Sequence, residues 1–574
     1  MYVILLRERL FLLISRIYRY VLLWLTELHG DLKKKIIILT MSRPKVKVVQ
    51  GELEGIESVT EDGKKYYSFL GIPYAKPPVG DLRFKDPLPA EPWEEVKDAS
   101  EEGNISLQFD GEAKKCIGDE DCLFLNVHTP HLSSTGPNRL PVMIYIHGGA
   151  FNYGSGNRSE FGPEYIVEKN CILVSLNYRL GVLGFLCLDA AFAPGNMGLK
   201  DQSLAIEWIR DNIGAFNGDS KNITLFGISA GACSIESHLL SPCSRGLFQK
   251  AILQSGSILN PFVVARDHLD NPIKLAEGLG KTLKEPKDLY NFFKNKTAKE
   301  LVTESTNIIT DKNIQRIQFC GFTPVVCAIP GYENFLSEIP IELLKKGNFE
   351  KVPTISGFSN KEGILMKTFF KNENKALLDE GKLVKCLPIE FKMDRKILEE
   401  KLKSIYKPRN DDINQDDYIL DYLTDVVIHG GLCKSTELRL KHHSDQYFYC
   451  FNYDGNMNYF KTKAGFKERG ACHADDQTYL GTSHTVRASN ALPKDIIVRK
   501  QMVQMWTDFA KTGGSPDSWL PGMPTYIQYA VGLGKIEYTY LRKIYPHVPE
   551  GMCSEDVPPN HKSIKRIFIH MNQE

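Results

Sequence analysis

Short apolar runs alternate with amphipathic stretches over most of the chain. The runs have the length of buried strands, whereas the intervening stretches place apolar residues at helical spacing. Apolar strands that alternate with helices are typical of a largely parallel sheet covered on both faces, so the pattern predicts an α/β fold. The expected strands are Leu140–Ile146, Cys171–Tyr178, Ile223–Phe226, Lys250–Gln254, Val352–Gly357 and Tyr447–Tyr453, and the expected helices are Ser203–Phe216, Ala230–Leu240 and Lys494–Lys511.

The region before these strands is patterned differently. Lys45–Glu54 alternates polar and apolar residues and stops at Gly55, which predicts a hairpin. Tyr66–Pro87 is punctuated by proline and glycine, so we expect a fixed loop there rather than a regular element. Glu120–Pro130 contains one more strand.

The first residues combine strong apolarity with basic charge. Met1–Leu25 is rich in Leu, Ile, Val and Phe but is interrupted by arginines such as Arg7 and Arg16. Charges within the stretch disfavour both a transmembrane helix and the apolar region of a signal peptide. A basic amphipathic helix in a membrane interface fits better, with peripheral membrane contact through residues 1–28. A signal anchor, or an upstream extension with translation starting at Met41, is the alternative.

This segment bears on location rather than on chemistry. We expect residues 1–44 to be an amphipathic segment with a linker, and residues 45–574 to form one large domain. The expected location is intracellular, either cytoplasmic or peripherally membrane-associated, with a signal-anchored or secreted protein as the alternative.

Composition places the chain among globular proteins, with 42% hydrophobic and 25% charged residues in 574. The net charge of +1 does not indicate nucleic acid as a partner. The 13 cysteines are scattered, without a Cys-x-x-Cys pair or a Cys/His cluster of metal-binding spacing, so no metal or other cofactor is expected. Cys116 and Cys122 can bridge only with favourable local geometry, and free thiols in a reducing compartment are the simpler interpretation.

A Gly-x-Ser-x-Gly motif with Ser229 at its centre joins the strand Ile223–Phe226 to the helix Ala230–Leu240. At such a corner the glycines allow a tight, strained turn that lifts the serine hydroxyl clear of the backbone. The free N–H groups at the start of the helix favour negative charge beside it. The motif therefore suggests a nucleophile elbow, although a five-residue pattern alone is weak evidence and a Gly-rich turn is the alternative interpretation.

Several spaced motifs resemble the type-B carboxylesterase family, most like the insect α-esterases. They are Glu120–Val127, Gly195–Gln202, Phe216–Gly231 and Met505–Gly513, and the resemblance runs from about Lys45 over nearly the whole chain. It implies the α/β-hydrolase fold, a single large domain with a mostly parallel central sheet flanked by helices.

The resemblance also implies a catalytic triad. Ser229 is the expected nucleophile, His473 the general base and then acid, and Glu362 the carboxylate that orients the histidine. Asp475 and Asp476 are rival partners for His473, although residues so close along the chain seldom turn back onto the same imidazole.

The tetrahedral oxyanion of acyl transfer needs backbone donors. Gly148, Gly149 and Ala150 follow a strand with closely spaced N–H groups. Carried over position by position, the family motif gives Gly149, Ala150 and Ala230 as donors. Ser255 matches a family serine near the acid, and a polar residue capping a strand end is its other interpretation.

Three positions depart from the family pattern. Ile228 precedes the nucleophile where the family usually has Glu, which makes the pocket more apolar and less suited to cationic esters. Ala150 stands where glycine is usual, and its methyl group narrows the space for bulky acyl or phosphoryl groups. Cys122 lacks the upstream cysteine with which secreted members form a disulfide.

We therefore expect a serine carboxylesterase that hydrolyses small-molecule apolar esters, including xenobiotic or lipid esters, through an acyl-enzyme. A hormone or lipid-ester hydrolase and a non-catalytic adhesion relative are the alternatives, while Ile228 argues against a cholinesterase. The sequence leaves open the physiological ester and the oligomeric state.

Overall fold

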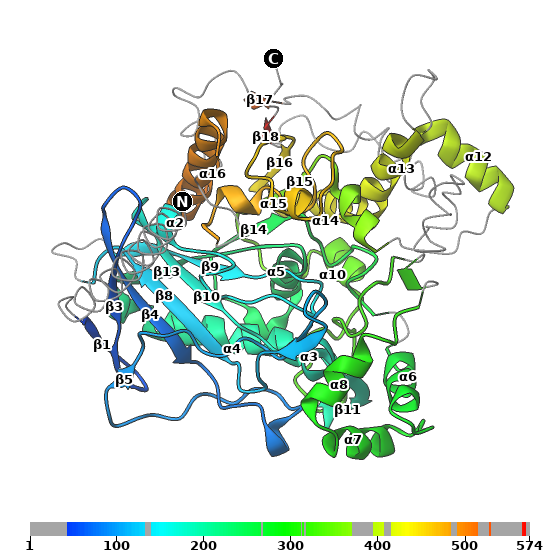
Figure 1. Cartoon of the computed structure of the whole chain (residues 1–574), viewed down its shortest axis with the longest axis horizontal. Coiled ribbons are helices and arrows are strands. Elements are labelled where there is room, and N and C mark those ends of the chain that lie inside the picture. The colour runs from blue at the N-terminus through cyan, green and yellow to red at the C-terminus, as the bar shows by residue number, and fades with distance from the viewer. Residues whose placement is uncertain are drawn as a thin grey trace, which may run out of the picture.

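A computed structural model gives the structure of the chain (Figure 1). It describes residues 43–132, 139–265, 268–310, 313–314, 317–369, 394–406, 415–483, 491–514, 527–529 and 565–569. The N-terminal amphipathic segment falls almost entirely outside these residues and stays a prediction. None of the helices in the described ranges combines the length and apolarity needed to cross a bilayer.

The central element is a mixed sheet of 11 strands in the described part of the chain. Its middle is parallel, from β10 through β9, β13, β14, β15 and β16 to β18. At one edge β8, β4 and β3 each pair antiparallel with their neighbours, and at the other β17 pairs antiparallel with β18. In spatial order the strands are β17 (Ile527–Tyr529), β18 (Lys565–Ile569), β16 (Gln446–Phe451), β15 (Thr354–Ser359), β14 (Lys250–Gln254), β13 (Gly218–Ile228), β9 (Leu140–Ile146), β10 (Ile172–Leu176), β8 (Phe124–Thr129), β4 (Lys65–Pro73) and β3 (Ile56–Val59).

Helices cover both faces of this sheet (Figure 1). Along β9, Val142 and Ile144 pack with α4 (Met197–Asn212) and α5 (Ala230–Leu240) in one core cluster, whereas Met143 joins a second cluster with α16 (Pro493–Thr512) and α2 (Glu164–Val167). Successive side chains of a strand point to opposite faces, so a strand between two helical layers has to be apolar throughout. This is why the central strands could be read from the sequence.

Smaller elements surround the sheet. The hairpin predicted at Lys45–Glu54 is confirmed as β1 (Lys45–Val48) and β2 (Gly51–Glu54), which pair antiparallel. The remaining short strands are β5 (Lys97–Asp98), β6 (Gln108–Asp110), β7 (Lys115–Ile117), β11 (Cys187–Ala190) and β12 (Ala193–Pro194). Further α-helices are α3 (Gly181–Phe185), α6 (Asp270–Gly278), α7 (Pro286–Lys294), α8 (Ala298–Ser305), α10 (Pro340–Lys346), α12 (Arg395–Tyr406), α13 (Gln415–Thr424), α14 (Gly430–Leu440) and α15 (Tyr459–Lys463). A π-helical turn, η6 (Asp425–His429), lies between α13 and α14, and 3-10 helices include η4 (Glu362–Thr368) after β15.

The expectation of an irregular loop over Tyr66–Pro87 is wrong for its first part, which forms strand β4. The strand pairs with β3 and β8, and its register shifts between Phe69 and Ile72. Gly71 lies at this bulge with φ of 61°, and its N–H donates to Asn126 Oδ1 at 2.9 Å. The glycine therefore marks a bulge inside a strand rather than the absence of one.

Candidate active site

The predicted site residues follow the carboxyl ends of five neighbouring strands. His147–Ala150 follows β9, Ser229 follows β13, Ser255 follows β14, Glu362 comes shortly after β15, and His473 lies in the loop region after β16. These strands are parallel neighbours in the order β9, β13, β14, β15, β16. Segments that leave parallel strands in this way meet at one edge of the sheet, which is where ligands bind in α/β folds.

Ser229 adopts a strained backbone conformation. It follows β13 directly and is the N-cap residue of α5, with φ of 56° and ψ of −123°. A non-glycine residue there lies outside the favourable regions of φ/ψ space, and such strain is held at functional sites by the surrounding structure. The serine is partly exposed while Ala230 beside it is buried, so solvent reaches the corner at the serine.

The two glycines of the motif are required because the end of β9 lies against them. A Cβ atom at Gly227 would lie 2.3 Å from the carbonyl oxygen of Ile146, and one at Gly231 only 2.0 Å from the same oxygen. The turn thus packs its backbone directly on the strand that leads to His147. Backbone contact of this closeness is open to glycine alone.

The turn is fixed to the next strand by main-chain bonds. The N–H of Ser229 donates to the carbonyl of Gln254 at 2.8 Å, and the N–H of Ser255 donates to the carbonyl of Gly357 at 2.7 Å. Ser229, Ser255 and the end of β15 are therefore held in one continuous hydrogen-bonded edge.

Glu362 and His473 form a buried pair. Glu362 Oε2 lies 2.6 Å from His473 Nδ1, and the two side chains are 0% and 6% exposed. The other carboxylate oxygen, Oε1, accepts from Ser255 Oγ and from the N–H of Ser359, both at 2.6 Å. Burial alone would raise the pKa of Glu362, but the attraction of His473 and the hydrogen bonds from His473 and Ser255 outweigh it, so the pKa lies below its ordinary value.

The rival carboxylates turn away from the imidazole. Asp475 Oδ2 accepts from the N–H of Cys472 at 2.6 Å. Asp476 Oδ2 accepts from Tyr449 at 2.6 Å and from the Gln254 amide at 3.0 Å. Geometry therefore selects Glu362 among the three acidic residues as the partner of the histidine.

The segment after β9 bends sharply. Gly149, Ala150 and Phe151 have φ of 111°, 54° and 61°. A Cβ atom at Gly149 would lie 1.9 Å from the carbonyl oxygen of Tyr153, so only glycine fits there. Ala150 adopts the left-handed region that glycine favours, at some cost in strain.

This bent segment presents donors beside the serine. No hydrogen bond among the described residues uses the N–H of Gly149 or Ala150, and Ala230, the first residue of α5, has no intrahelical acceptor for its N–H. A Cβ atom at Gly148 would lie 3.2 Å from the Cβ of Ser229, which places the segment against the elbow. The arrangement suits an oxyanion that forms on a group bonded to Ser229.

His147 supports this segment, a role that the sequence did not reveal. Its buried ring stacks on Tyr178 with centroids 4.4 Å apart, and its Nδ1 lies 2.7 Å from the carbonyl oxygen of Gly148. The Tyr178 hydroxyl donates to the carbonyl of His147 at 3.0 Å. Burial lowers the pKa of His147 to about 4, so the ring stays neutral at pH values above this.

Ile228 is buried, with 2% exposure, and its Cγ2 lies near Gly148. The family usually has a carboxylate at this position. Here an aliphatic side chain packs against the segment Gly148–Ala150 instead. Cys116 and Cys122 are both free thiols and form no disulfide with each other.

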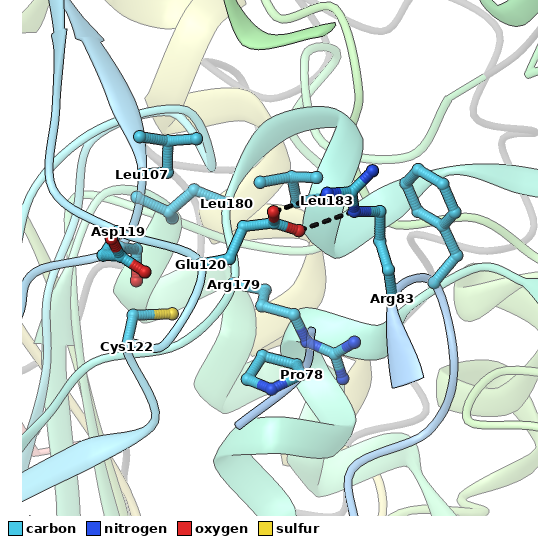
Figure 2. A pocket seen from close by; sticks show the side chains of 11 residues that line it. Pro78, Arg83, Leu107, Asp119, Glu120, Cys122, Arg179, Leu180 and Leu183 are labelled. Atoms are coloured by element: carbon cyan, nitrogen blue, oxygen red, sulfur yellow. Dashed lines mark hydrogen bonds and ion pairs between the residues drawn. The ribbon is translucent and has the colours of Figure 1, made fainter. Parts of the chain in front are cut away.

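A cavity lies apart from these residues, between Arg83, Glu120, Cys122 and Arg179 (Figure 2). Arg83 and Glu120 form a bidentate ion pair across it, with both N···O distances at 2.6 Å. Its volume of about 10 Å³ holds one water molecule at most. It cannot admit an ester, and we assign it to the packing of this loop.

Comparison with known proteins identifies the family. Residues 42–541 match the carboxylesterase family. Esterase FE4 of Myzus persicae is 35% identical over 507 residues, which cover 83% of this chain and 86% of that protein. Juvenile hormone esterase of Tribolium castaneum is 34% identical over 507 residues, covering 83% and 85%.

A solved structure agrees with this result. Juvenile hormone esterase from Manduca sexta, determined with OTFP covalently attached, has a TM-score of 0.72 and 28% identity, and the match covers 83% of this chain and 92% of that one. The chain therefore belongs to the carboxylesterase family and has the α/β-hydrolase fold. The predictions of the family, of a carboxylic ester hydrolase and of a mostly parallel sheet flanked by helices are confirmed.

Proposed function

We propose that the protein is a serine esterase that hydrolyses apolar carboxylic esters through an acyl-enzyme. Ser229 is the nucleophile, His473 the general base and acid, and Glu362 the carboxylate that orients the imidazole. The observation that carries the proposal is the buried Glu362–His473 pair, at 2.6 Å, on the same edge of the sheet as the strained Ser229 turn.

In the first half of the reaction Ser229 Oγ attacks the ester carbonyl carbon while His473 Nε2 takes the hydroxyl proton. Negative charge develops on the former carbonyl oxygen, where the N–H groups of Gly149, Ala150 and Ala230 donate. The C–O bond to the alcohol then breaks, and the imidazolium returns its proton to the departing oxygen.

In the second half a water molecule attacks the acyl carbon and loses a proton to His473. Breakdown of this intermediate releases the acid, and the proton goes back to Ser229 Oγ. Throughout, the carboxylate of Glu362 accepts from Nδ1–H, which leaves Nε2 free to accept a proton and stabilises the imidazolium when it forms.

Two features favour an uncharged, apolar substrate. Ile228 removes a negative charge from beside the elbow. In addition, Phe262, Phe319 and Phe369 stack with centroids 5.1 and 4.6 Å apart, and the first and last of these lie shortly after Ser255 and Glu362 in the chain. A cationic ester would find no compensating charge from Ile228, whereas an aliphatic, aromatic or isoprenoid acyl chain gains from burial.

The test uses the purified chain and Ser229→Ala with a series of p-nitrophenyl esters of increasing acyl length. We expect turnover that Ser229→Ala abolishes, and covalent labelling of the intact protein but not of the variant by a fluorophosphonate probe. Turnover that does not depend on Ser229, or the absence of both turnover and labelling, would refute the proposal that the protein is a serine esterase acting through Ser229.

Substrate class is tested separately with a choline ester, its uncharged 3,3-dimethylbutyl isostere, and the methyl ester of a long isoprenoid acid. The proposal predicts a higher kcat/KM for the uncharged isostere than for the choline ester. A preference for the choline ester would refute the apolar site while leaving the esterase mechanism intact. Dominance of the isoprenoid ester would place the enzyme among lipid-ester hydrolases.

A further inference from the structure

Four side chains of the kinds that bind transition metals meet around β11. Asp189 Oδ1 lies 2.9 Å from Nε2 of His268, 3.3 Å from Sγ of Cys327 and 3.5 Å from Sγ of Cys187. The donor atoms of Cys187, Asp189 and His268 all lie within 4.8 Å of one another. The proposed esterase mechanism uses none of the four, so the cluster calls for a separate explanation.

The residues come from three segments that are distant in sequence. For this reason the sequence shows no metal-binding spacing. Cys187 and Asp189 lie two residues apart on β11, whose register shifts between Cys187 and Ala190, and Asp189 has φ of 52°. Cys327 lies in the segment after Phe322, and His268 comes just before α6.

Main-chain and side-chain bonds hold these segments together without any ligand. Asn196 clamps Val325, accepting from its N–H at 2.9 Å and donating to its carbonyl at 2.8 Å. The N–H of Ala265 donates to the carbonyl of Pro324 at 2.9 Å, which ties the chain before His268 to the chain before Cys327. The donor atoms are therefore brought together by the fold itself.

We propose that Cys187, Asp189, His268 and Cys327 form a zinc-binding site. Two sulfur donors, one imidazole and one carboxylate are a donor set that Zn²⁺ accepts in tetrahedral geometry. Zinc–ligand bonds of about 2.0–2.3 Å separate tetrahedral ligands by about 3.3–3.8 Å. The separations from Asp189 to the two sulfurs lie within this range and the one to His268 is shorter, so a small outward movement of the carboxylate suits these pairs. Cys327 Sγ lies outside the mutual 4.8 Å range of the other three donor atoms, so its side chain has to move closer to complete the tetrahedron.

The surroundings also suit a metal. Both cysteines are buried, in an apolar cluster with Val325, whereas the side chains of Asp189 and His268 are 47% and 23% exposed. The sulfur side of the site is thus dry and the oxygen–nitrogen side is open to solvent, which gives the ion a path of entry. Binding forms two Zn–S bonds and releases two protons to solvent, one from each thiol.

A zinc ion at this position would fasten β11 to the segment before α6 and to the segment containing Cys327. The four ligands come together only in the folded chain, so zinc binds the folded state and not the unfolded state. Binding therefore raises the free energy of unfolding by mass action. The proposal is independent of the esterase mechanism and can fail without affecting it.

The experiment is a metal titration of the purified, thiol-reduced full-length chain. Zn²⁺ is measured by competition with a chromogenic chelator, and Co²⁺ by the intense visible absorption of a tetrahedral thiolate complex. We expect one ion per chain. Loss of one ligand in Cys187→Ser or Cys327→Ser should weaken binding by about 100-fold or more, and His268→Asn by about 10-fold or more.

Cys116→Ser is the matched control, because Cys116 lies outside the cluster. Its Sγ lies 3.3 Å from Thr303 Oγ1 instead. This variant should bind as tightly as the unaltered chain. Thermal unfolding of each variant without metal establishes that it is folded, and only the unaltered chain and the control should gain thermal stability when Zn²⁺ is added.

Three results would overturn the proposal. They are the absence of stoichiometric binding, binding that the cluster variants leave unchanged, and a Cys187–Cys327 disulfide that oxidised glutathione forms, with release of reduced glutathione, even when Zn²⁺ is supplied. The last result would assign the pair of thiols to redox chemistry instead.

Discussion

Replacing Glu362 by glutamine tests which of three neighbouring carboxylates serves His473. Gln at this position can keep its carbonyl oxygen facing Ser255 Oγ and the N–H of Ser359, which now donate to Glu362 Oε1. Its NH₂ group then faces His473 Nδ1. Two N–H groups cannot bond each other, so the imidazole proton moves to Nε2, the atom that accepts the proton of Ser229 in the proposed mechanism.

The magnitude follows from the geometry of the pair. Glu362 Oε2 and His473 Nδ1 are 2.6 Å apart. Opposite charges centred about 3–4 Å apart attract by about 4–6 kcal/mol at an effective dielectric constant near 20. In the proposed mechanism the imidazolium forms when His473 takes the proton of Ser229, so this attraction favours the transition state over the ground state. We expect kcat/KM to fall by about 10³–10⁴.

The assay compares kcat/KM on one short p-nitrophenyl ester for Glu362→Gln, Asp475→Asn and Asp476→Asn. Asp475 and Asp476 bond Cys472, Tyr449 and Gln254 rather than the imidazole. Their variants should therefore stay within about tenfold of the unaltered enzyme, since they act only on packing near the histidine. Thermal unfolding controls for folding. The reasoning is refuted if folded Glu362→Gln stays within tenfold while either aspartate variant loses a thousandfold.

Three further outcomes follow from the site. Gly231→Ala places a methyl group 2.0 Å from the Ile146 carbonyl and should lower the free energy of unfolding by about 3 kcal/mol or more, whereas Gly111→Ala, which meets nothing within 4 Å, is the control that should not. Ala150→Gly removes a methyl group at φ of 54° and should raise the relative kcat/KM for bulky acyl groups and the rate of inactivation by dialkyl phosphates; equal changes for small and bulky groups would contradict it. Burial raises the pKa of Asp475 to about 7, so its contribution to stability is complete below its unfolded pKa and is lost as pH rises through about 7. Asp475→Asn should therefore stabilise the fold by about 2–3 kcal/mol more at about pH 8 than at about pH 5, and a melting-temperature difference independent of pH would count against this.

The core of the sheet could be predicted because its strands are apolar on both faces. The predicted bounds of Leu140–Ile146 and Lys250–Gln254 coincide with β9 and β14, and the helix predicted at Ala230–Leu240 coincides with α5. Buried elements bounded by turn residues leave little freedom in where they begin and end.

Buried polar residues explain where the helix prediction was incomplete. The helix expected from Ser203 begins six residues earlier as α4, at Met197. Its first turns carry Asp201, which is buried and pairs with Arg179 at 2.6 Å. A charged residue on the buried face breaks the apolar periodicity, and only the partner, distant in sequence, explains it.

The candidate site likewise has one feature that local sequence predicts and others that depend on contacts between distant segments. The Ser229 turn is local, since two glycines and a strand end are enough to indicate it. The selection of Glu362 over Asp475 and Asp476 depends on where β15 and the loop after β16 lie relative to each other. The cluster around Asp189 depends on three segments that no local pattern connects.

A buried charge network explains how the strained turn is kept in place. Glu236 lies on α5, the helix that Ser229 caps. Its carboxylate forms an ion pair with Arg439 of α14, and the two side chains are 0% and 1% exposed. Glu236 Oε2 also accepts from Ser257 Oγ at 2.5 Å, and Arg439 Nη2 donates to Ser356 Oγ at 2.7 Å.

These bonds join α5 to the segment after β14, which contains Ser255, and to β15, the strand that precedes Glu362. A residue such as Ser229 in a strained conformation costs about 1–3 kcal/mol and persists only where its surroundings determine it. Breaking a buried pair by removing one partner costs about 3–5 kcal/mol, more than relaxation of the turn could return. The helix therefore cannot rotate to relieve Ser229, and the same network that orients the helix fixes the spacing between the serine and the Glu362–His473 pair.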